Sequence, residues 1–222
     1  MLNWLSRPVR LKKIYKEYKD QSFTLLDIGC GNHSPSQTKR YFPHCTYHGL
    51  DVQEYNIDAS DYKAMDHFYK IDLDTDSLSH LPDNFYDVII MSHVLEHLAH
   101  PYQTLNTLCS KLRPGGKIYL EFPSLRSFGF PSMEGTLQFC DDGTHIFMPN
   151  PYEVANLLLK NGIAIKKSRI RRDFIRFCAG PFFLLNNLRR RLLGKRFNSR
   201  GLWDLWGFAH YVYGEKKSCH PS

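Results

Sequence analysis

The stretch that most constrains the fold is Thr24 to Asn32, which reads TLLDIGCGN. The run Leu25 to Ile28, apolar except at Asp27, predicts a short strand buried on both faces, and Gly29 and Gly31 predict a tight turn from that strand into a helix. Because glycine lacks a Cβ and tolerates a positive φ, the backbone of such a turn can lie close to a ligand at a helix N-terminus. Asp27 puts a negative charge beside the turn, which favours a ligand with a cationic end.

The chain then alternates strand-like apolar runs with helical stretches. Further strands are expected at Tyr47–Leu50, Tyr69–Leu73, Tyr86–Met91, Lys117–Phe122, Ile163–Ile170 and His210–Lys216. Helices are expected at Ser36–Phe42, with Ser34 and Ser36 as candidate caps, from Val94 through Leu112, and at Pro151–Lys160 before Gly162. This alternation, with right-handed crossovers, predicts an α/β fold with a doubly wound, mostly parallel, Rossmann-like sheet. A chain of 222 residues fits one domain, 1–222.

Asp51 closes the second strand-like run about twenty residues after the glycine turn, where nucleotide-binding folds have an acid that binds ribose hydroxyls. Together, the segments DIGCGN, GLD, FYDVII, SHVLEH and LRPGGKIYLEFP resemble the class I S-adenosylmethionine-dependent methyltransferases in order and separation, over Phe23 to Phe122. The resemblance implies S-adenosylmethionine as cofactor and an antiparallel last strand that pairs with the strand before it. The cofactor-binding residues that it implies are Asp27, Gly29, Cys30, Gly31, Asp51, Val52, Asp72, Leu73 and Ser92.

Two positions leave details of cofactor binding open. Asp72 follows the third expected strand, where the family's acid accepts a hydrogen bond from the adenine amino group and the next backbone N–H, here that of Leu73, reaches the ring. The alternative is that Asp72 only caps the loop 74–81. His33 stands where the family often has a third glycine, and this departure predicts a wider turn.

Two histidines are candidate catalytic bases. Methyl transfer from a sulfonium to a hydroxyl requires an in-line nucleophile and an acceptor for the hydroxyl proton. His93 lies at the expected end of the fourth strand, and His145 lies in the long segment 124–150 that leaves the fifth strand. An imidazole titrates near neutrality and suits this role. The alternative for each histidine is a structural hydrogen-bonding residue.

No metal ion is expected. Metal-dependent relatives of the catechol type have carboxylates at the ends of the fourth and fifth strands, where this chain has Ser92 and Pro123. His93 to His97 also matches the HxxEH pattern of inverted zinc proteases. That interpretation requires both histidines on one helical face and a third ligand motif, and the sequence supports neither.

Basic charge is concentrated near the C-terminus. Between Lys160 and Arg200 there are thirteen Lys and Arg and one acid, Asp173, whereas the rest of the chain has 16 basic and 21 acidic residues. Such a segment indicates an anionic partner, which can be a phosphate-bearing substrate, an anionic lipid surface or nucleic acid. The segment 171–209 is an insertion between the last two expected strands, where a short connection would suffice.

The insertion is predicted to contain a basic amphipathic helix that starts at Pro181. Its expected apolar side faces away from Arg189, Arg190 and Lys195, and consists of Phe182, Leu184, Leu185, Leu188 and Leu192. Further apolar residues are Phe174, Ile175, Phe177, Leu202, Trp203, Leu205, Trp206 and Phe208. Such a helix can lie in an anionic membrane interface, or its apolar side can cover the domain's own sheet. The pattern does not favour nucleic acid, because the aromatic residues cluster with leucines instead of alternating with basic residues.

The N-terminal segment 1–22 is expected to form a basic helix, broken near Pro8, that lies as a lid over the cofactor and acceptor site or merely caps the sheet. It lacks the continuous apolar stretch of a secretion signal, and no stretch is long enough to span a membrane. Six cysteines without a CxxC pair predict reduced thiols. A cytoplasmic protein, soluble or peripheral at the membrane, is expected.

The function predicted from all of this is S-adenosylmethionine-dependent O-methylation of a small, lipid-linked or glycan-linked acceptor. Two alternatives remain at this point. One is a catalytically silent relative that only binds the cofactor or a partner. The other is an RNA-directed or membrane-directed methyltransferase in which the insertion selects the partner.

Overall fold

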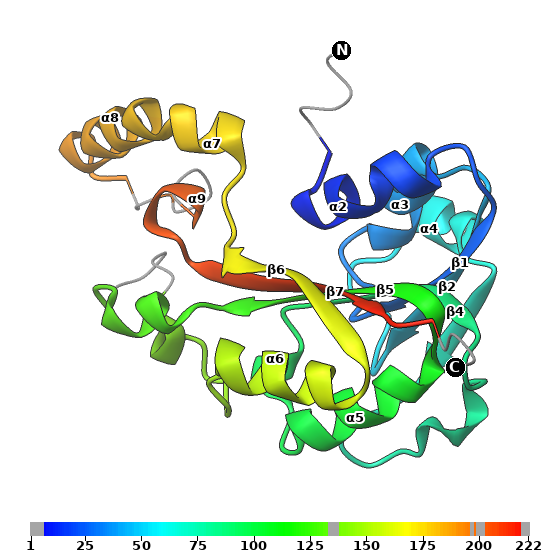
Figure 1. Ribbon diagram of the computed structural model, residues 1–222. Helices are drawn as coiled ribbons and strands as arrows, with labels where there is room; N and C mark the ends of the chain where they lie inside the picture. Colours follow the sequence, from blue (N-terminus) through cyan, green and yellow to red (C-terminus); the bar gives the residue numbers. More distant parts are fainter. Residues whose placement is uncertain (1–6, 133–137, 196–197, 199–202, 219–222) are drawn as a thin grey trace.

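The fold is built on one seven-stranded sheet (Figure 1), and the computed structural model describes residues 7–132, 138–195, 198 and 203–218. The strands are β1 (Phe23–Ile28), β2 (Cys45–Asp51), β3 (His67–Lys70), β4 (Tyr86–Ser92), β5 (Leu112–Pro123), β6 (Ile163–Ile170) and β7 (Ala209–Lys216). Their order is β3-β2-β1-β4-β5-β7-β6. All neighbours up to β5 pair in parallel, and β7 is antiparallel to both β5 and β6. The predicted Rossmann-like sheet with its antiparallel last strand is confirmed.

Helices cover both faces of the sheet. On one face lie α2 (Val9–Tyr18), α3 (Ser34–Tyr41) and α4 (Ala59–Ala64), and on the other lie α5 (Pro101–Lys111) and α6 (Pro151–Lys160). The core is divided accordingly into two clusters, because alternate side chains of each strand point to opposite faces. One cluster packs Leu11 and Ile14 of α2 against Tyr47, and the other packs Leu105 of α5 and Leu158 of α6 against Ile118.

Several predicted boundaries shift in the structure. The N-terminal helix begins at Val9, directly after Pro8, and the earlier part of the prediction, including Leu5, lies outside the described residues. The prediction that Ser34 or Ser36 caps the next helix is wrong, because α3 begins at Ser34 itself and its N-cap is His33, which makes no side-chain capping bond. The third strand lies at His67–Lys70 instead of Tyr69–Leu73.

The helix expected from Val94 through Leu112 is divided in two. A 3₁₀ turn, η2 (Leu95–His97), precedes α5, whose first residue is Pro101. Proline fixes a helix N-terminus because it has no N–H to donate to a preceding turn. Three further 3₁₀ turns are η1 (Leu78–His80), η3 (Leu125–Gly129) and η4 (Phe139–Asp141).

The insertion after β6 forms α7 (Phe174–Cys178), α8 (Gly180–Leu192) and α9 (Trp203–Trp206). Figure 1 shows α7 and α8 extending away from the sheet. The apolar side chains of α8 are exposed, so they do not cover the sheet, and that alternative is wrong. The large apolar side chains exposed on α7 and α8 are Phe174, Ile175, Phe177, Phe182, Leu184, Leu185, Leu188 and Leu192. Leu202 lies outside the described residues.

The prediction that Arg189 lies opposite the apolar side of α8 is wrong. It follows Leu185 by four residues and precedes Leu192 by three, and residues at these spacings are neighbours on one helix face. None of the helices in the described part of the chain combines the length and hydropathy that crossing a bilayer requires. The five described cysteines are free thiols.

Candidate active site

The glycine turn after β1 has no room for side chains. Gly29 has a φ of 72°, and a Cβ on it would lie 2.5 Å from Val94 Cγ2. A Cβ on Gly31 would lie 2.7 Å from the carbonyl oxygen of Tyr55, which belongs to the segment after β2. Both glycines are therefore required for the close approach of the neighbouring segments. The turn is extended by Asn32 and His33, which have positive φ values of 55° and 58°.

Asp27 lies behind this turn with a carboxylate that is already hydrogen-bonded within the protein. The hydroxyls of Ser34 and Tyr47 donate to its Oδ2 over 2.5 and 2.6 Å. Burial raises the pKa of Asp27, and the charge of Arg10 together with these two hydrogen bonds opposes that rise. Cys30 is also buried, and its Sγ lies under Gly49. Only the main chain of Cys30 is available to a ligand.

Three strand ends meet at the same edge of the sheet. In the parallel register, Ile28 of β1 is level with Leu50 of β2 and Met91 of β4, so that the residues following them lie side by side. Asp51 accepts hydrogen bonds over 3.3 Å from the backbone N–H of Gly31 and of Gln53. This arrangement brings the predicted residues Gly29, Gly31, Asp51, Val52 and Ser92 to one crevice edge, where open α/β sheets bind ligands.

Asp72 and Leu73 lie in the loop that follows β3, although both were expected within the third strand. The Asp72 carboxylate accepts from the backbone N–H of Asp74 over 3.0 Å, which is the loop-capping contact weighed against a role in ligand binding. Ile71 donates its backbone N–H to the carbonyl oxygen of Asp51 over 3.1 Å. Asp72 therefore lies one residue beyond the crevice edge. Its loop-capping bond from the Asp74 N–H does not exclude a further hydrogen bond from a ligand to the same carboxylate.

His93 follows β4 and lies between two carboxylates. Its Nδ1 is 3.0 Å from Glu96 Oε1 and its Nε2 is 3.3 Å from Glu121 Oε1. Burial lowers the pKa of His93, but the hydrogen bonds and charges of Glu121 and Glu96 outweigh it and raise the pKa to about 9. At neutral pH both ring nitrogens therefore carry protons and donate to the carboxylates.

His145 also lies close to Glu96, with a ring nitrogen within 4.8 Å of a carboxylate oxygen of Glu96. Its Nδ1–H donates to the carbonyl oxygen of Phe139 over 2.8 Å, and its ring stacks on the Phe139 ring at a centroid distance of 4.5 Å. The Nε2 atom, 3.6 Å from Asp142 Oδ2, thus holds the lone pair of the neutral ring. The structure therefore brings the two candidate bases together around one buried carboxylate.

Glu96, His97 and His145 each offer one potential ligand atom, and these atoms lie within 4.8 Å of one another. His33, Asp58 and Asp61 form a second such group. Glu96 is fully buried, and its Oε2 has no hydrogen-bond partner among the described residues. The protease-like pairing of His93 with His97 does not occur, because His93 has a φ of 56° at the strand end and contacts Glu96 and Glu121 instead.

A buried charge network connects His93 to the insertion, and sequence reasoning did not find it. Arg171 Nε lies 3.4 Å from Glu121 Oε1, and Arg171 Nη2 lies 3.7 Å from Asp204 Oδ2. Burial opposes ionisation of Glu121, but Arg171 and His93 lower its pKa to about 2. Asp204 also accepts from the backbone N–H of Asp173 over 2.7 Å. These residues come from β5, α9 and the end of β6, and no local pattern connects them.

The N-terminal helix α2 contacts the same region. Lys12 pairs with Asp173 over 2.5 Å, and Lys13 Nζ lies 4.7 Å from the centre of the Tyr211 ring. Arg10 donates to Ser34 Oγ over 3.1 Å, next to Asp27. The predicted lid thus lies between the glycine turn and the start of the insertion.

Comparison with known proteins gives one family. The profile of a family described as a methyltransferase domain matches residues 5–167. Among curated proteins, a ubiquinone biosynthesis O-methyltransferase of Bartonella tribocorum is 27% identical over 149 residues, which cover 64% of this chain and 60% of that protein. The corresponding protein of Marinobacter nauticus is 24% identical over 172 residues, which cover 72% and 71%. The chain thus spans less than two thirds of the first of these relatives.

Solved structures share the fold. A SAM dependent methyltransferase from Archaeoglobus fulgidus superposes with a TM-score of 0.58 and 20% identity over 93% of this chain and 91% of that chain. An S-adenosylmethionine dependent methyltransferase from Mesorhizobium loti gives a TM-score of 0.62 and 16% identity over 92% and 97%. At these identities the similarity concerns the fold alone.

Proposed function

The chain belongs to the S-adenosylmethionine-dependent methyltransferase family, and we propose that it methylates a hydroxyl oxygen of a small, lipid-linked or glycan-linked acceptor. The observation that carries this proposal is the crevice edge, where the glycine turn and the Asp51 carboxylate lie at the ends of β1 and β2, together with the Glu96–His145 pair in the segments that follow β4 and β5. The similarity to ubiquinone biosynthesis O-methyltransferases favours an oxygen acceptor.

The residues at the glycine turn fit S-adenosylmethionine. Gly29 and Gly31 lack side chains because neighbouring main chain and Val94 take the space that a Cβ would fill, and this packing fixes the turn whose backbone we assign to the nucleoside. We assign the ribose hydroxyls to Asp51, whose carboxylate has unused acceptor capacity beyond its two backbone partners. Val52, 53% exposed, would contact the adenine ring, with Asp72 and Leu73 at its amino edge and Ser92 near the methionine end.

When bound, the cofactor supplies a methyl group on a positively charged sulfur, which is a good leaving group. The chain's own residues then have three tasks, which are to hold the acceptor oxygen in line, to exclude water and to remove the hydroxyl proton. Asp27, behind the turn, adds a negative potential that favours a cationic ligand even though its oxygens are hydrogen-bonded to Ser34 and Tyr47.

We assign the proton acceptor to His145 and not to His93. His93 donates from both nitrogens to Glu96 and Glu121 and is protonated at neutral pH, which leaves it no lone pair. His145 has its Nδ1–H fixed by the Phe139 carbonyl, and Nε2 keeps a lone pair. The nearby Glu96 carboxylate stabilises the imidazolium that forms when His145 takes a proton. His93 then orients Glu96 as a positioning residue.

The proposed partners are the acceptor and an anionic membrane surface, contacted through 171–209. Two rival functions make different predictions. A silent relative would bind S-adenosylmethionine without transferring its methyl group to any acceptor. An RNA-directed enzyme would depend on basic side chains alone and lose its partner steeply with salt.

The test is methyl transfer from labelled S-adenosylmethionine to a panel of phenols, lipid-linked phenols, glycolipids and free sugars. We expect transfer to an oxygen of one class. In that reaction, His145→Ala should lower kcat at least 100-fold while the calorimetric affinity for S-adenosylmethionine is unchanged. His93→Gln, the matched control, should lower kcat less and should not shift its pH dependence. A loss confined to the KM for the acceptor would contradict the role of His145 as a base.

A chelator distinguishes a base from a metal ligand, because a cation held by Glu96, His97 and His145 would occupy the Nε2 lone pair. We expect unchanged turnover after dialysis against a chelator. Turnover that falls and returns with added Mg²⁺ or Zn²⁺ would assign His145 to a metal site instead.

A further inference from the structure

Helix α8 shows the reverse of the usual pattern of a surface helix. Its buried residues are Gly180, which packs on Leu205, and Asn187, whose amide donates to the carbonyl oxygens of Phe183 and Asn198. Its leucines face outward: Leu185 is 67% exposed and Leu192 is 80% exposed. A helix whose role is to cover its own domain turns its leucines inward. The outer side of α8 therefore requires an apolar partner.

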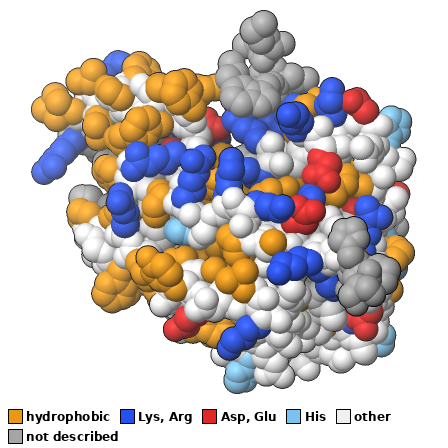
Figure 2. Space-filling view, in the orientation of Figure 1, with side chains coloured by type: hydrophobic (Ala, Val, Ile, Leu, Met, Phe, Trp, Pro, Cys, Tyr) orange, Lys and Arg blue, Asp and Glu red, His pale blue; other side chains and the backbone are white. Residues whose placement is uncertain are grey.

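The apolar side continues onto α7 and is surrounded by basic residues. We define the docking surface as a set of exposed apolar and basic side chains of both helices and of the residues that flank them: Phe174, Phe182, Leu184, Leu185, Leu188 and Leu192, with Arg172, Arg176, Arg189, Arg191 and Lys195. Figure 2 shows hydrophobic side chains gathered over α7 and α8, with Lys and Arg beside them. Two acids near these helices, Asp173 and Asp204, are buried and pair with Lys12 and Arg171.

We infer that the docking surface inserts into the interface of an anionic lipid bilayer and presents the crevice edge to it, so that the enzyme takes its acceptor from the membrane. The membrane partner rests on the function proposed above. Apolar side chains flanked by basic ones match the acyl region and the phosphates of such a bilayer. A second copy of the chain fits poorly, because a two-fold contact would bring the same positive surface against itself.

The orientation follows from the connection between β6 and α7. Strand β6 runs parallel to β1, β4 and β5 and ends at Ile170, on the crevice edge, and α7 begins at Phe174. Ile170 of β6 pairs with His210 of β7, and His210 pairs on its other side with Phe122 of β5, which is next to Glu121. A bilayer that contacts α7 and α8 therefore faces the edge of the sheet that carries the candidate site.

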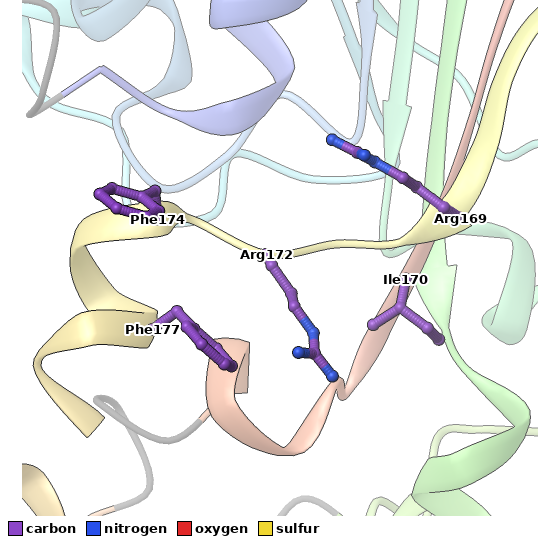
Figure 3. Close-up of a pocket in the computed structure, with 5 residues that line it drawn as sticks. All are labelled: Arg169, Ile170, Arg172, Phe174 and Phe177. Atoms are coloured by element: carbon purple, nitrogen blue, oxygen red, sulfur yellow. The ribbon is translucent and has the colours of Figure 1, made fainter. Parts of the chain in front are cut away.

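A pocket of about 420 Å³ lies between the docking surface and that edge. Figure 3 shows its lining residues, which come from the end of β6, from α7 and from the connection between them: Arg169, Ile170, Arg172, Phe174 and Phe177. Arg172 lies over the Phe177 ring at 4.9 Å, and Arg169 donates to the Tyr211 hydroxyl over 2.9 Å. Aromatic walls with guanidinium groups at the margin suit the junction of a lipid's headgroup and chain. The pocket is therefore the expected path of a lipid-linked acceptor.

The first experiment is flotation of the full chain with vesicles of phosphatidylcholine alone or of an equimolar mixture with phosphatidylglycerol. We expect binding to the mixture, part of which persists in about 1 M salt, where charge attraction is screened. Leu185→Ser and Leu188→Ser should each weaken binding about tenfold or more, since one fully buried leucine contributes at least roughly this factor. Arg189→Gln and Arg191→Gln should each weaken it roughly fivefold.

Matched controls distinguish binding through the docking surface from non-specific adsorption to vesicles. Leu159→Ser removes a leucine of α6 that is 54% exposed on the opposite face, and Lys63→Gln removes an exposed lysine of α4, and both should bind as the wild type does. Equal binding by the leucine variants and the wild type would overturn the inference. So would binding that high salt removes completely, or a dimer in light scattering that the leucine variants abolish without vesicles.

The second experiment tests orientation. Cys178 of α7 and Cys140 of η4 are exposed thiols, so each can carry a fluorophore while the other is replaced by Ser. Energy transfer to headgroup-labelled lipid should be strongest from Cys178, intermediate from Cys140 near the crevice edge, and weakest from Leu159→Cys on α6. Equal transfer from all three positions would overturn the orientation. Calorimetric affinity for S-adenosylmethionine, measured in every variant, tests the proposed function independently of vesicle binding.

Discussion

The carboxylate of Glu121 offers a direct test of the charge on His93. In the structure, Glu121 Oε1 lies 3.3 Å from His93 Nε2 and 3.4 Å from Arg171 Nε, and Glu121 is 5% exposed. Glu121→Gln preserves the shape of this side chain and removes its charge. We expect the substitution to cost about 3 kcal/mol in the free energy of unfolding, because it leaves Arg171 and His93 each with one carboxylate fewer.

The pH dependence identifies the group responsible. The pKa of His93 rises from 6.5 to about 9 on folding, which corresponds to about 3 kcal/mol at about 1.4 kcal/mol per pH unit. Because the folded pKa is the higher one, this stabilisation is fully present below pH 6.5 and is lost as the pH rises through 9. The His93 side chain is 27% exposed, so screening by solvent is limited. The wild type should therefore lose about 2 kcal/mol between pH 7 and pH 9.5.

Urea unfolding at pH 7 and pH 9.5 measures both quantities. In Glu121→Gln, His93 keeps only Glu96, and we expect the loss over this pH range to fall to about half. His93→Gln should flatten the dependence further, and the double variant should equal His93→Gln in this respect. Asp20→Asn, which removes an exposed carboxylate beside Lys19, serves as the control with wild-type behaviour. A Glu121→Gln protein with the wild-type pH dependence would refute a protonated His93.

Three further predictions concern the crevice edge. Asp51→Ala should weaken S-adenosylmethionine binding about 10- to 100-fold in calorimetry, as expected for lost hydrogen bonds to a charged acceptor. The variant should still fold, although it loses the bonds from Gly31 and Gln53, and unchanged affinity would remove the ribose role of Asp51. Gly31→Ala should lower the free energy of unfolding by about 1–3 kcal/mol in urea, because its Cβ would lie 2.7 Å from the Tyr55 carbonyl oxygen, whereas Gly143→Ala, with open space around it, should have little effect. Asp27→Asn should destabilise the protein by about 1–3 kcal/mol, since Ser34 and Tyr47 would lose a charged acceptor; a variant as stable as the wild type would contradict the buried charge.

The sheet was predictable because its determinants are local. The central strands β1 and β4 are mostly apolar runs bounded by turn residues, and β4 and β6 begin at Tyr86 and Ile163 as expected. The position of Asp51 at the edge of the sheet followed from chain spacing alone, since β2 must return beside β1. β3 was misplaced because pairing with β2 begins at His67, two residues before the apolar pattern suggests.

The candidate site was predictable only in part. Spacing identified the glycine turn and the strand-end aspartates, but the environment of His93 depends on Glu121 and Arg171, which approach it through tertiary packing. The pattern of α8 showed an apolar side without showing which way that side faces. Asn187 and Gly180 on the other side were the available signal, because buried helix faces rarely consist of such residues.

The register at the base of the insertion has a consequence for how such proteins diversify. Ile170 and His210 are directly opposite each other on β6 and β7, so the 39 residues between them begin and end at adjacent points. A two-residue hairpin turn between these strands would leave the sheet and its cofactor half complete. A replacement for this part of the molecule can readdress the same methylation chemistry to a different location provided that it keeps Arg171, because Arg171 pairs with Glu121 beside His93.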